Sequence, residues 1–227
     1  MKKIFSLLTG FLLILLVAGC GEENTQIESK PDFQPPVNKI ERNADDKILM
    51  AYFSVPETDN PKNMNLDEEN STVIVDGEVF GNTQYVAQII QQSTGANIFR
   101  IEPVTPYPTN HGELEQVATK EKQSNALPEI SAKIENFDSY KIIFVGYPIW
   151  YGDMPRILYS FFKSYDFSGK TIVPFITSGG AGFANSINEI QSLQPNAKVI
   201  EGGLALNRNV IQNSEDDIKN WLKNLGF

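Results

Sequence analysis

The sequence is poor in the side chains that most often carry catalysis or bind metals. It has one cysteine, Cys20, and one histidine, His111. With no second thiol, the chain has no internal disulfide, no Cys/His metal site and no dithiol redox motif. Any redox chemistry must therefore come from a bound cofactor. We predict neither a metal site nor a catalytic residue. We expect His111 to be a solvated loop residue, with a group that moves protons beside that cofactor as the alternative.

Positive charge is also scarce. The chain has 19 Lys and Arg against 28 Asp and Glu, which gives a net charge of −9. Without an N-terminal segment that holds only Lys2 and Lys3, the charge becomes −9 − 2 = −11. This balance argues against binding to nucleic acid, whose phosphates need basic neutralisation. It favours a basic protein partner or a small neutral or cationic substrate.

The first twenty residues have the pattern of an export signal. Lys2 and Lys3 precede a mainly apolar stretch, 4–18, which is too short for a helix that spans a membrane. The stretch 16–20, LVAGC, resembles the bacterial lipobox, in which the cysteine is lipidated and becomes the mature N-terminus. We therefore expect an exported protein, anchored by a lipid on Cys20 to the outer face of a bacterial cell membrane. The alternative is an ordinary secretory signal that contains a cysteine.

A polar segment follows the signal. Residues 21–46 contain few apolar side chains and three prolines, so they cannot bury enough surface to order themselves. We interpret them as a flexible tether that spans roughly 30 Å. The remainder, 47–227, has the size and apolar content of one α/β domain.

This domain alternates strand and helix patterns. Its central stretch, 142–145 (IIFV), is an uninterrupted apolar run typical of a strand buried on both faces of a parallel sheet. Five units of a strand followed by a helix predict a three-layer, doubly wound α/β fold with a five-stranded parallel sheet. The predicted strands are 48–53, 96–103, 141–147, 171–177 and 198–206. The predicted helices are 83–94, 113–134 with a break at Pro128, one that begins at Pro155, 183–193, and one that begins at Ser214. For the last helix, Ser214 and Asp217 approximate a capping box.

Three loops follow the carboxyl ends of predicted strands, where open α/β sheets bind ligands. The first contains Ser54 and continues to Gly81, Asn82 and Thr83 at the start of a helix. The second is 146–155, GYPIWYGDMP, and the third is 175–180, FITSGG. In this order and number, the three motifs resemble the flavodoxin family, in particular the flavodoxin-like lipoproteins of bacteria.

The resemblance implies strand order 2-1-3-4-5 and FMN bound above the first, third and fourth strands. It implies a phosphate held by neutral donors, a ring packed on Trp150 with Tyr151 beside it, and a polar ring edge bound by the third loop. The implied cofactor-binding residues are Ser54, Asn82, Thr83, Pro148, Ile149, Trp150, Tyr151, Gly152, Thr177, Ser178, Gly179 and Gly180. The residues agree with this, since a helix N-terminus with hydroxyl donors suits one phosphate, and the chain lacks the G-x-x-x-x-G-K-[ST] loop of nucleotide triphosphatases.

Other interpretations of these residues stay open. Asn82 or Thr83 can simply cap a helix, Trp150 can pack in a core, and the glycines can serve tight turns. The sequence also departs from the family at 55–80, an insertion between Ser54 and Gly81. Its Asp76-Gly77 pair predicts a β-hairpin, which either restricts access to the flavin or has no function. The insertion leaves two candidates for the phosphate contacts, 56–58 and 81–83, and we favour the second with Ser54.

The function expected from this is electron transfer by a membrane-anchored FMN protein, with a redox partner protein or a small quinone-like acceptor. One alternative is an FMN-dependent NAD(P)H:quinone or azo oxidoreductase of related fold. A second is a surface binding module without flavin.

Overall fold

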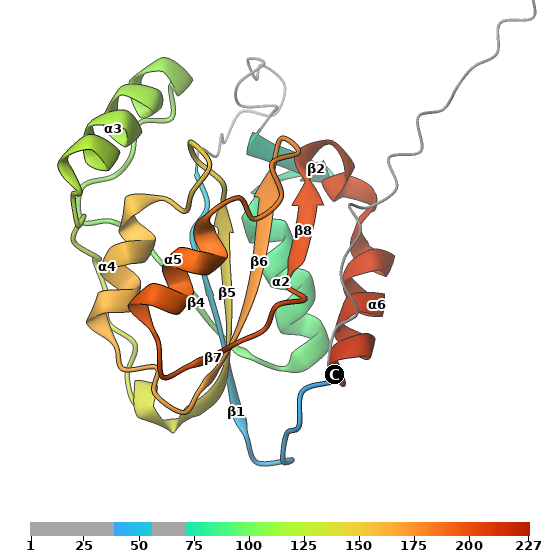
Figure 1. Cartoon of the computed structure of the whole chain (residues 1–227). Coiled ribbons are helices and arrows are strands. Elements are labelled where there is room, and N and C mark those ends of the chain that lie inside the picture. The colour runs from blue at the N-terminus through green and yellow to red at the C-terminus, as the bar shows by residue number, and fades with distance from the viewer. Residues whose placement is uncertain (1–38, 56–70) are drawn as a thin grey trace, which may run out of the picture.

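The computed structural model describes residues 39–55 and 71–227 of the chain. The predicted signal with Cys20, the tether as far as residue 38, and the insertion residues 56–70 lie outside the described residues. In the described part, a parallel sheet lies between two layers of helices (Figure 1). This is the predicted three-layer α/β architecture.

The central sheet has the predicted strand order. Its strands run β4-β1-β5-β6-β7, all neighbours are parallel, and β8 also pairs with β6. Their bounds are β1 Lys47–Tyr52, β4 Asn97–Arg100, β5 Tyr140–Pro148, β6 Thr171–Ser178, β7 Lys198–Val199 and β8 Leu204–Asn207. The apolar run in β5 is buried on both faces, as its sequence predicts.

The predicted fifth strand is divided into β7 and β8. The division faces Pro174 of β6, which has no N–H group to donate to a neighbouring strand. Gly203 lies close to the same place, since a Cβ atom on it would meet the Pro174 carbonyl oxygen at 2.5 Å. The chain therefore leaves the regular ladder here and rejoins it at Leu204, opposite Phe175.

Helices cover both faces of the sheet. Packed on one face are α2 (Asn82–Thr94) and α6 (Glu215–Leu225), and on the other are α3 (His111–Ser124), α4 (Arg156–Ser164) and α5 (Ser186–Leu193) (Figure 1). Two short 3-10 helices, η1 (Phe137–Ser139) and η2 (Arg208–Asn213), complete the elements. Each face has its own apolar cluster, with Trp221 and Phe144 in one and Phe161 and Tyr147 in the other.

Two helix predictions were wrong in detail. The predicted helix 113–134 ends at Ser124, because Asn125 adopts a left-handed conformation with φ 51° and Ile130 then bridges to Pro103. The expected Ser214/Asp217 capping box does not form. The Ser214 hydroxyl donates to the Ile211 carbonyl at 2.7 Å instead, so it ends η2 rather than capping α6.

The predicted hairpin in the insertion is confirmed. Strands β2 (Thr72–Val75) and β3 (Glu78–Gly81) pair antiparallel, with Thr72 opposite Gly81. Asp76 and Gly77 form the two-residue turn, and both have positive φ, at 52° and 83°. The second strand leads directly into α2.

The first described residues pack against the last helix. Ile40, which the sequence places in the tether, is 3% exposed, and its N–H donates to the Leu225 carbonyl at 2.8 Å. The Arg42 guanidinium lies 4.6 Å from the centre of the Phe227 ring. The residues before β1 therefore contact the domain at the end of α6, far from the carboxyl edge of the sheet. Among the described helices, none combines the length and apolar character needed to cross a bilayer.

The packing of β5 on β6 leads to a first prediction. A Cβ atom on Gly146 would lie 2.0 Å from the Phe175 ring, which is fully buried. We expect Gly146→Ala to lower the free energy of unfolding by roughly 1–3 kcal/mol or more, because the core has no room for the methyl group. Urea denaturation followed by circular dichroism measures this loss.

Gly112→Ala is the matched control. A Cβ atom there meets only Asn110 Oδ1, at an ordinary 3.5 Å, and alanine is a better helix former than glycine. We expect no loss of stability for this variant. Equal denaturation midpoints for Gly146→Ala and Gly112→Ala would contradict the proposed close packing.

Candidate functional site

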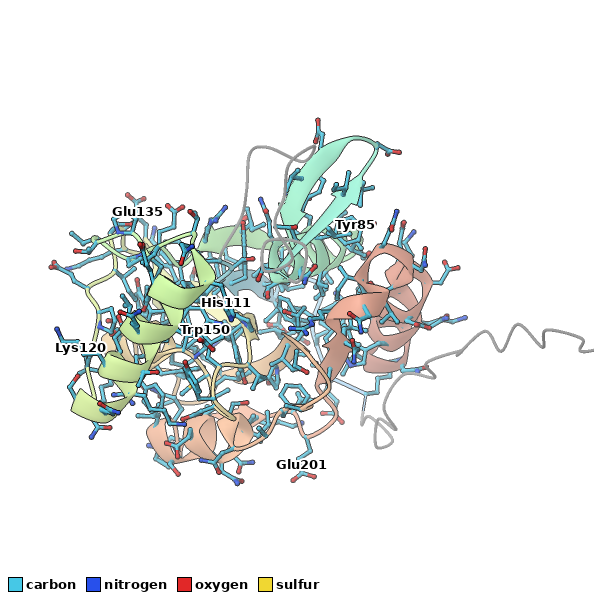
Figure 2. The ribbon with its side chains drawn as sticks, turned by 90° about the horizontal axis from the view of Figure 1, so that it is seen from above. Tyr85, His111, Lys120, Glu135, Trp150 and Glu201 are labelled. Atoms are coloured by element: carbon cyan, nitrogen blue, oxygen red, sulfur yellow. The ribbon has the colours of Figure 1, made fainter. Side chains whose placement is uncertain are left out.

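A cleft of about 170 Å³ lies at the carboxyl ends of β1, β5 and β6. Four segments meet there: the chain after β1, the start of α2, the loop after β5 and the loop after β6. Figure 2 views this edge of the molecule from above, with His111 and Trp150 near its centre. The lining residues are Ser54, Val55, Ser71, Asn82, Thr83, His111, Leu114, Pro148, Ile149, Trp150, Thr177, Ser178, Gly179 and Arg208.

One end of the cleft is the N-terminus of α2. The N-cap residue is Gly81, which has no side chain to accept from the first-turn N–H groups, and no acidic residue lies in that turn. The Thr83 hydroxyl lies 2.8 Å from the Thr177 hydroxyl, so it bonds across to β6 instead of capping its own helix. Ser54 is 4% exposed beside them. This end therefore combines a positive helix terminus with neutral hydroxyl groups.

The opposite wall is Trp150. Its indole ring meets the rings of Phe53 and Tyr107 edge to face, with both pairs of centroids 5.5 Å apart. The side chain is half-buried and faces the cleft. Its backbone pairs with Asp153 through two hydrogen bonds of 2.9 and 3.1 Å, which close a tight turn. Trp150 is thus held on two sides, and one part of the ring remains available to a ligand.

Most of the predicted site residues are together in this cleft, and three are not. Tyr151 points to α3, where its hydroxyl lies 3.1 Å from the Thr119 hydroxyl and its carbonyl accepts from Lys122 Nζ at 2.7 Å. Gly152, with φ 74°, completes the turn behind Trp150. Gly180 follows the lining residue Gly179, and its N–H donates to Ser178 Oγ at 3.2 Å. These three residues shape the loops without lining the cleft.

Sequence reasoning missed Arg208 of the cleft and undervalued His111. Arg208 directly follows β8, so its position after a parallel strand was the signal that could have identified it. His111 is the first residue of α3, and its Nε2 lies 3.6 Å from Glu115 Oε1. Within the described ranges, the cleft wall has no aspartate or glutamate. A chain of net charge −9 thus lines this cleft with one arginine, one histidine and neutral groups.

The sequence model of the flavodoxin family matches residues 72–225. The chain belongs to the flavodoxin family. None of the curated proteins matches it significantly.

Solved structures agree with this membership. A protein of Bacteroides eggerthii, provisionally named a flavoprotein, is 27% identical with a TM-score of 0.57, over 80% of this chain and 98% of that one. A similarly named protein of Bacteroides uniformis is 26% identical with a TM-score of 0.56, over 78% and 98%. A Lactobacillus acidophilus flavoprotein in complex with FMN is 16% identical with a TM-score of 0.53, over 78% and 99%, which supports the shared fold alone.

This member of the flavodoxin family supports Trp150 through a partly buried polar pair. The Tyr107 hydroxyl donates to Glu121 Oε2 at 2.9 Å, and Tyr107 in turn packs on Trp150. Burial raises the pKa of the Glu121 carboxyl, against the opposing effects of the Tyr107 hydrogen bond and of Arg156. A second cavity of about 290 Å³ lies behind Trp150, but there Asp153 is engaged by the Tyr159 hydroxyl at 2.7 Å, and Arg156 by the Ala126 carbonyl at 2.9 Å.

The raised pKa of Glu121 leads to a second prediction. A carboxyl whose pKa is higher in the folded protein than in the unfolded chain favours folding when protonated. This contribution is complete below the unfolded pKa of about 4.5 and is lost as pH rises through the folded pKa. We expect Glu121→Gln to remove that loss, so that the variant gains stability relative to wild type as pH rises above about 4.5. Urea midpoints between pH 4 and pH 8 measure it.

Glu113→Gln, at an exposed position of the same helix, is the control, for which we expect no such gain. The prediction is wrong if Glu121→Gln and wild type keep a constant difference in stability over this pH range.

Proposed function

We propose that this protein binds FMN in the cleft and acts in electron transfer at the outer face of a bacterial membrane. One observation carries the proposal. Hydroxyl groups lie at one end of the cleft, at the start of α2, and the Trp150 indole, held by neighbouring rings, lies at the other end. FMN has a matching shape, with a monophosphate at one end and a flat ring at the other. When bound, FMN supplies the capacity to take up and release one or two electrons.

The α2 end of the cleft suits a phosphate monoester. Helix N–H groups point out of the first turn, and the hydroxyls of Thr83 and Ser54 add donors. The Thr83 to Thr177 contact fixes the start of α2 against the end of β6, so these donors are in place before a ligand arrives. Preorganised donors cost little entropy on binding.

The Trp150 end of the cleft suits the ring. Phe53 and Tyr107 hold the indole, which leaves its remaining surface for stacking and excludes water from one side of the ring. Ser178 and Gly179 supply polar groups from the loop after β6. At about 170 Å³ the cleft is smaller than the 300 Å³ or more of sites that enclose a whole ligand, so FMN would extend beyond its described walls.

The similarity to the Lactobacillus flavoprotein that is solved with FMN supports the choice of cofactor. The charge of the chain supports the choice of role. A net charge of −9 favours docking to a basic redox protein, since complementary charge speeds encounter between partners. A small quinone-like acceptor is the other partner that this role allows.

The contact of Ile40 with α6 supports the proposed anchoring. Ile40 is bonded to Leu225 at the end of α6, whereas the cleft lies at the opposite edge of the sheet. A lipid on Cys20 would therefore connect to the domain at the side away from the cleft. The cleft would stay open to a partner.

A second candidate function has one observation in its favour. His111 lines the cleft, so a titratable group lies where a substrate above the ring would need a proton. This favours the FMN-dependent NAD(P)H:quinone or azo oxidoreductase. The third possibility, a flavin-free binding module, would leave the purified protein colourless and unable to take up FMN.

A third prediction tests the cofactor site. We expect the full chain, purified in detergent, to bind FMN, and Trp150→Ala to weaken that binding roughly tenfold through the loss of about 1.4 kcal/mol of stacking. Quenching of FMN fluorescence measures the dissociation constant. Tyr151→Phe is the control in the same turn, and we expect its affinity to equal that of wild type because Tyr151 points to α3.

Equal losses for Trp150→Ala and Tyr151→Phe would contradict a stacking role for Trp150.

The same preparation separates the two redox functions. Slow oxidation of NADPH in the presence of menadione agrees with a carrier. Fast, steady oxidation that is reduced in His111→Gln would establish the reductase instead.

A fourth prediction tests the anchor. We expect Cys20→Ser to move the expressed protein from the membrane pellet to the soluble extracytoplasmic fraction, because the lipid attachment site is lost. Asn24→Ser, just beyond the attachment site, should stay with the membrane. Ultracentrifugation followed by immunoblotting measures the distribution. An ordinary secretory signal would instead leave wild type and both variants soluble.

A further inference from the structure

Arg208 is the one described residue of the cleft wall that carries a permanent charge. It lies immediately after β8, whose last residue, Asn207, is opposite Ser178 of β6. Its guanidinium lies beside the loop after β6, with Cζ 3.5 Å and Nη1 3.6 Å from the place where a Cβ atom of Gly179 would be. The guanidinium thus lies beside this loop and lines the cleft together with Gly179.

The charge of Arg208 has no partner among the described carboxylates. The ion pairs within residues 39–55 and 71–227 join Arg100 to Glu102, His111 to Glu115 and Lys219 to Glu215. The side chain is exposed to solvent rather than packed in a core. Neither an ion pair nor packing within the described chain therefore accounts for an arginine at this position.

The proposed phosphate site does not need this arginine. The start of α2 already offers helix N–H groups and the hydroxyl of Thr83. Arg208 instead flanks Ser178 and Gly179, whose polar groups the proposed function places at the ring end of the cleft. A guanidinium is planar and weakly hydrated, so it suits a flat partner with delocalised charge.

We propose that Arg208 stabilises the negative charge that the bound flavin ring gains on reduction, and thereby raises its reduction potential. This rests on the proposed FMN site. Uptake of two electrons and one proton leaves the ring with one extra negative charge, and an external reductant supplies the electrons. Trp150 makes this negative charge less stable, because an aromatic wall excludes water from the ring. Arg208 makes the charge more stable through Coulomb attraction. The two residues together set the potential.

The experiment compares Arg208→Gln, Arg208→Lys and Lys198→Gln in the full chain, purified in detergent and loaded with FMN. Lys198 is an exposed cation on β7, paired with Thr171 at the far end of β6, roughly 20 Å from the cleft. Lys198→Gln therefore changes the net charge as Arg208→Gln does, without changing the cleft. Potentials are measured by dithionite reduction against a reference dye, and the affinities for oxidised FMN and riboflavin by fluorescence quenching.

We expect Arg208→Gln to reduce the preference for reduced over oxidised FMN roughly tenfold, which lowers a two-electron potential by about 30 mV. Arg208→Lys should lose less, and Lys198→Gln should leave the potential unchanged. Affinity for oxidised FMN should stay near that of wild type in all three variants.

Three results would overturn the inference alone. They are an unchanged potential in Arg208→Gln, an equal shift in Lys198→Gln, and a loss of affinity for oxidised FMN with none for riboflavin, which would make Arg208 a phosphate contact. A wild-type chain that binds no FMN would overturn the proposed function, and this inference with it.

Discussion

The burial of β5 on both faces is the constraint on which the other features depend. Because residues 142–145 are apolar on both sides, β5 must lie inside the sheet, with β1 and β6 as parallel neighbours and helices on either face. Parallel neighbours bring their carboxyl ends to one edge. Ser54, Pro148 and Ser178, far apart in sequence, therefore line one cleft. The Thr83 to Thr177 hydroxyl contact then fixes α2 to this edge. A cleft with ready donors follows from how the core is buried.

Local sequence patterns predicted the fold well. Contacts between residues distant in the sequence were harder to predict. The apolar run of β5 and the Asp76-Gly77 turn are both local, and each appears where the sequence indicated. The end of α3 was missed because the predicted break was at Pro128, whereas the left-handed Asn125 ends the helix earlier. The division of β7 from β8 depends on Pro174 in a neighbouring strand, a contact between residues distant in sequence.

The same distinction applies to the candidate site. Ser54, Thr83, Trp150 and Ser178 could be placed because each follows a strand or begins a helix on a recognisable motif. Tyr151 adjoins Trp150 in sequence, but the tight turn directs it to α3, and sequence spacing does not reveal a turn of that kind. Arg208 escaped because no motif surrounds it. Only the register in which β8 pairs with β6 brings it next to Gly179, and the missed break in the fifth strand concealed that register.

The insertion after β1 shows how a site can survive the division of its loop. Ser54 and Gly81 are separated by residues 55–80, a separation that would disperse the donors if the intervening chain left the cleft freely. The β2–β3 hairpin prevents this, because Thr72 pairs with Gly81 and so returns the chain to the start of α2. Ser71, one residue earlier, lines the cleft together with Ser54. The hairpin thus keeps Ser71 and the start of α2 together, as a tight turn would.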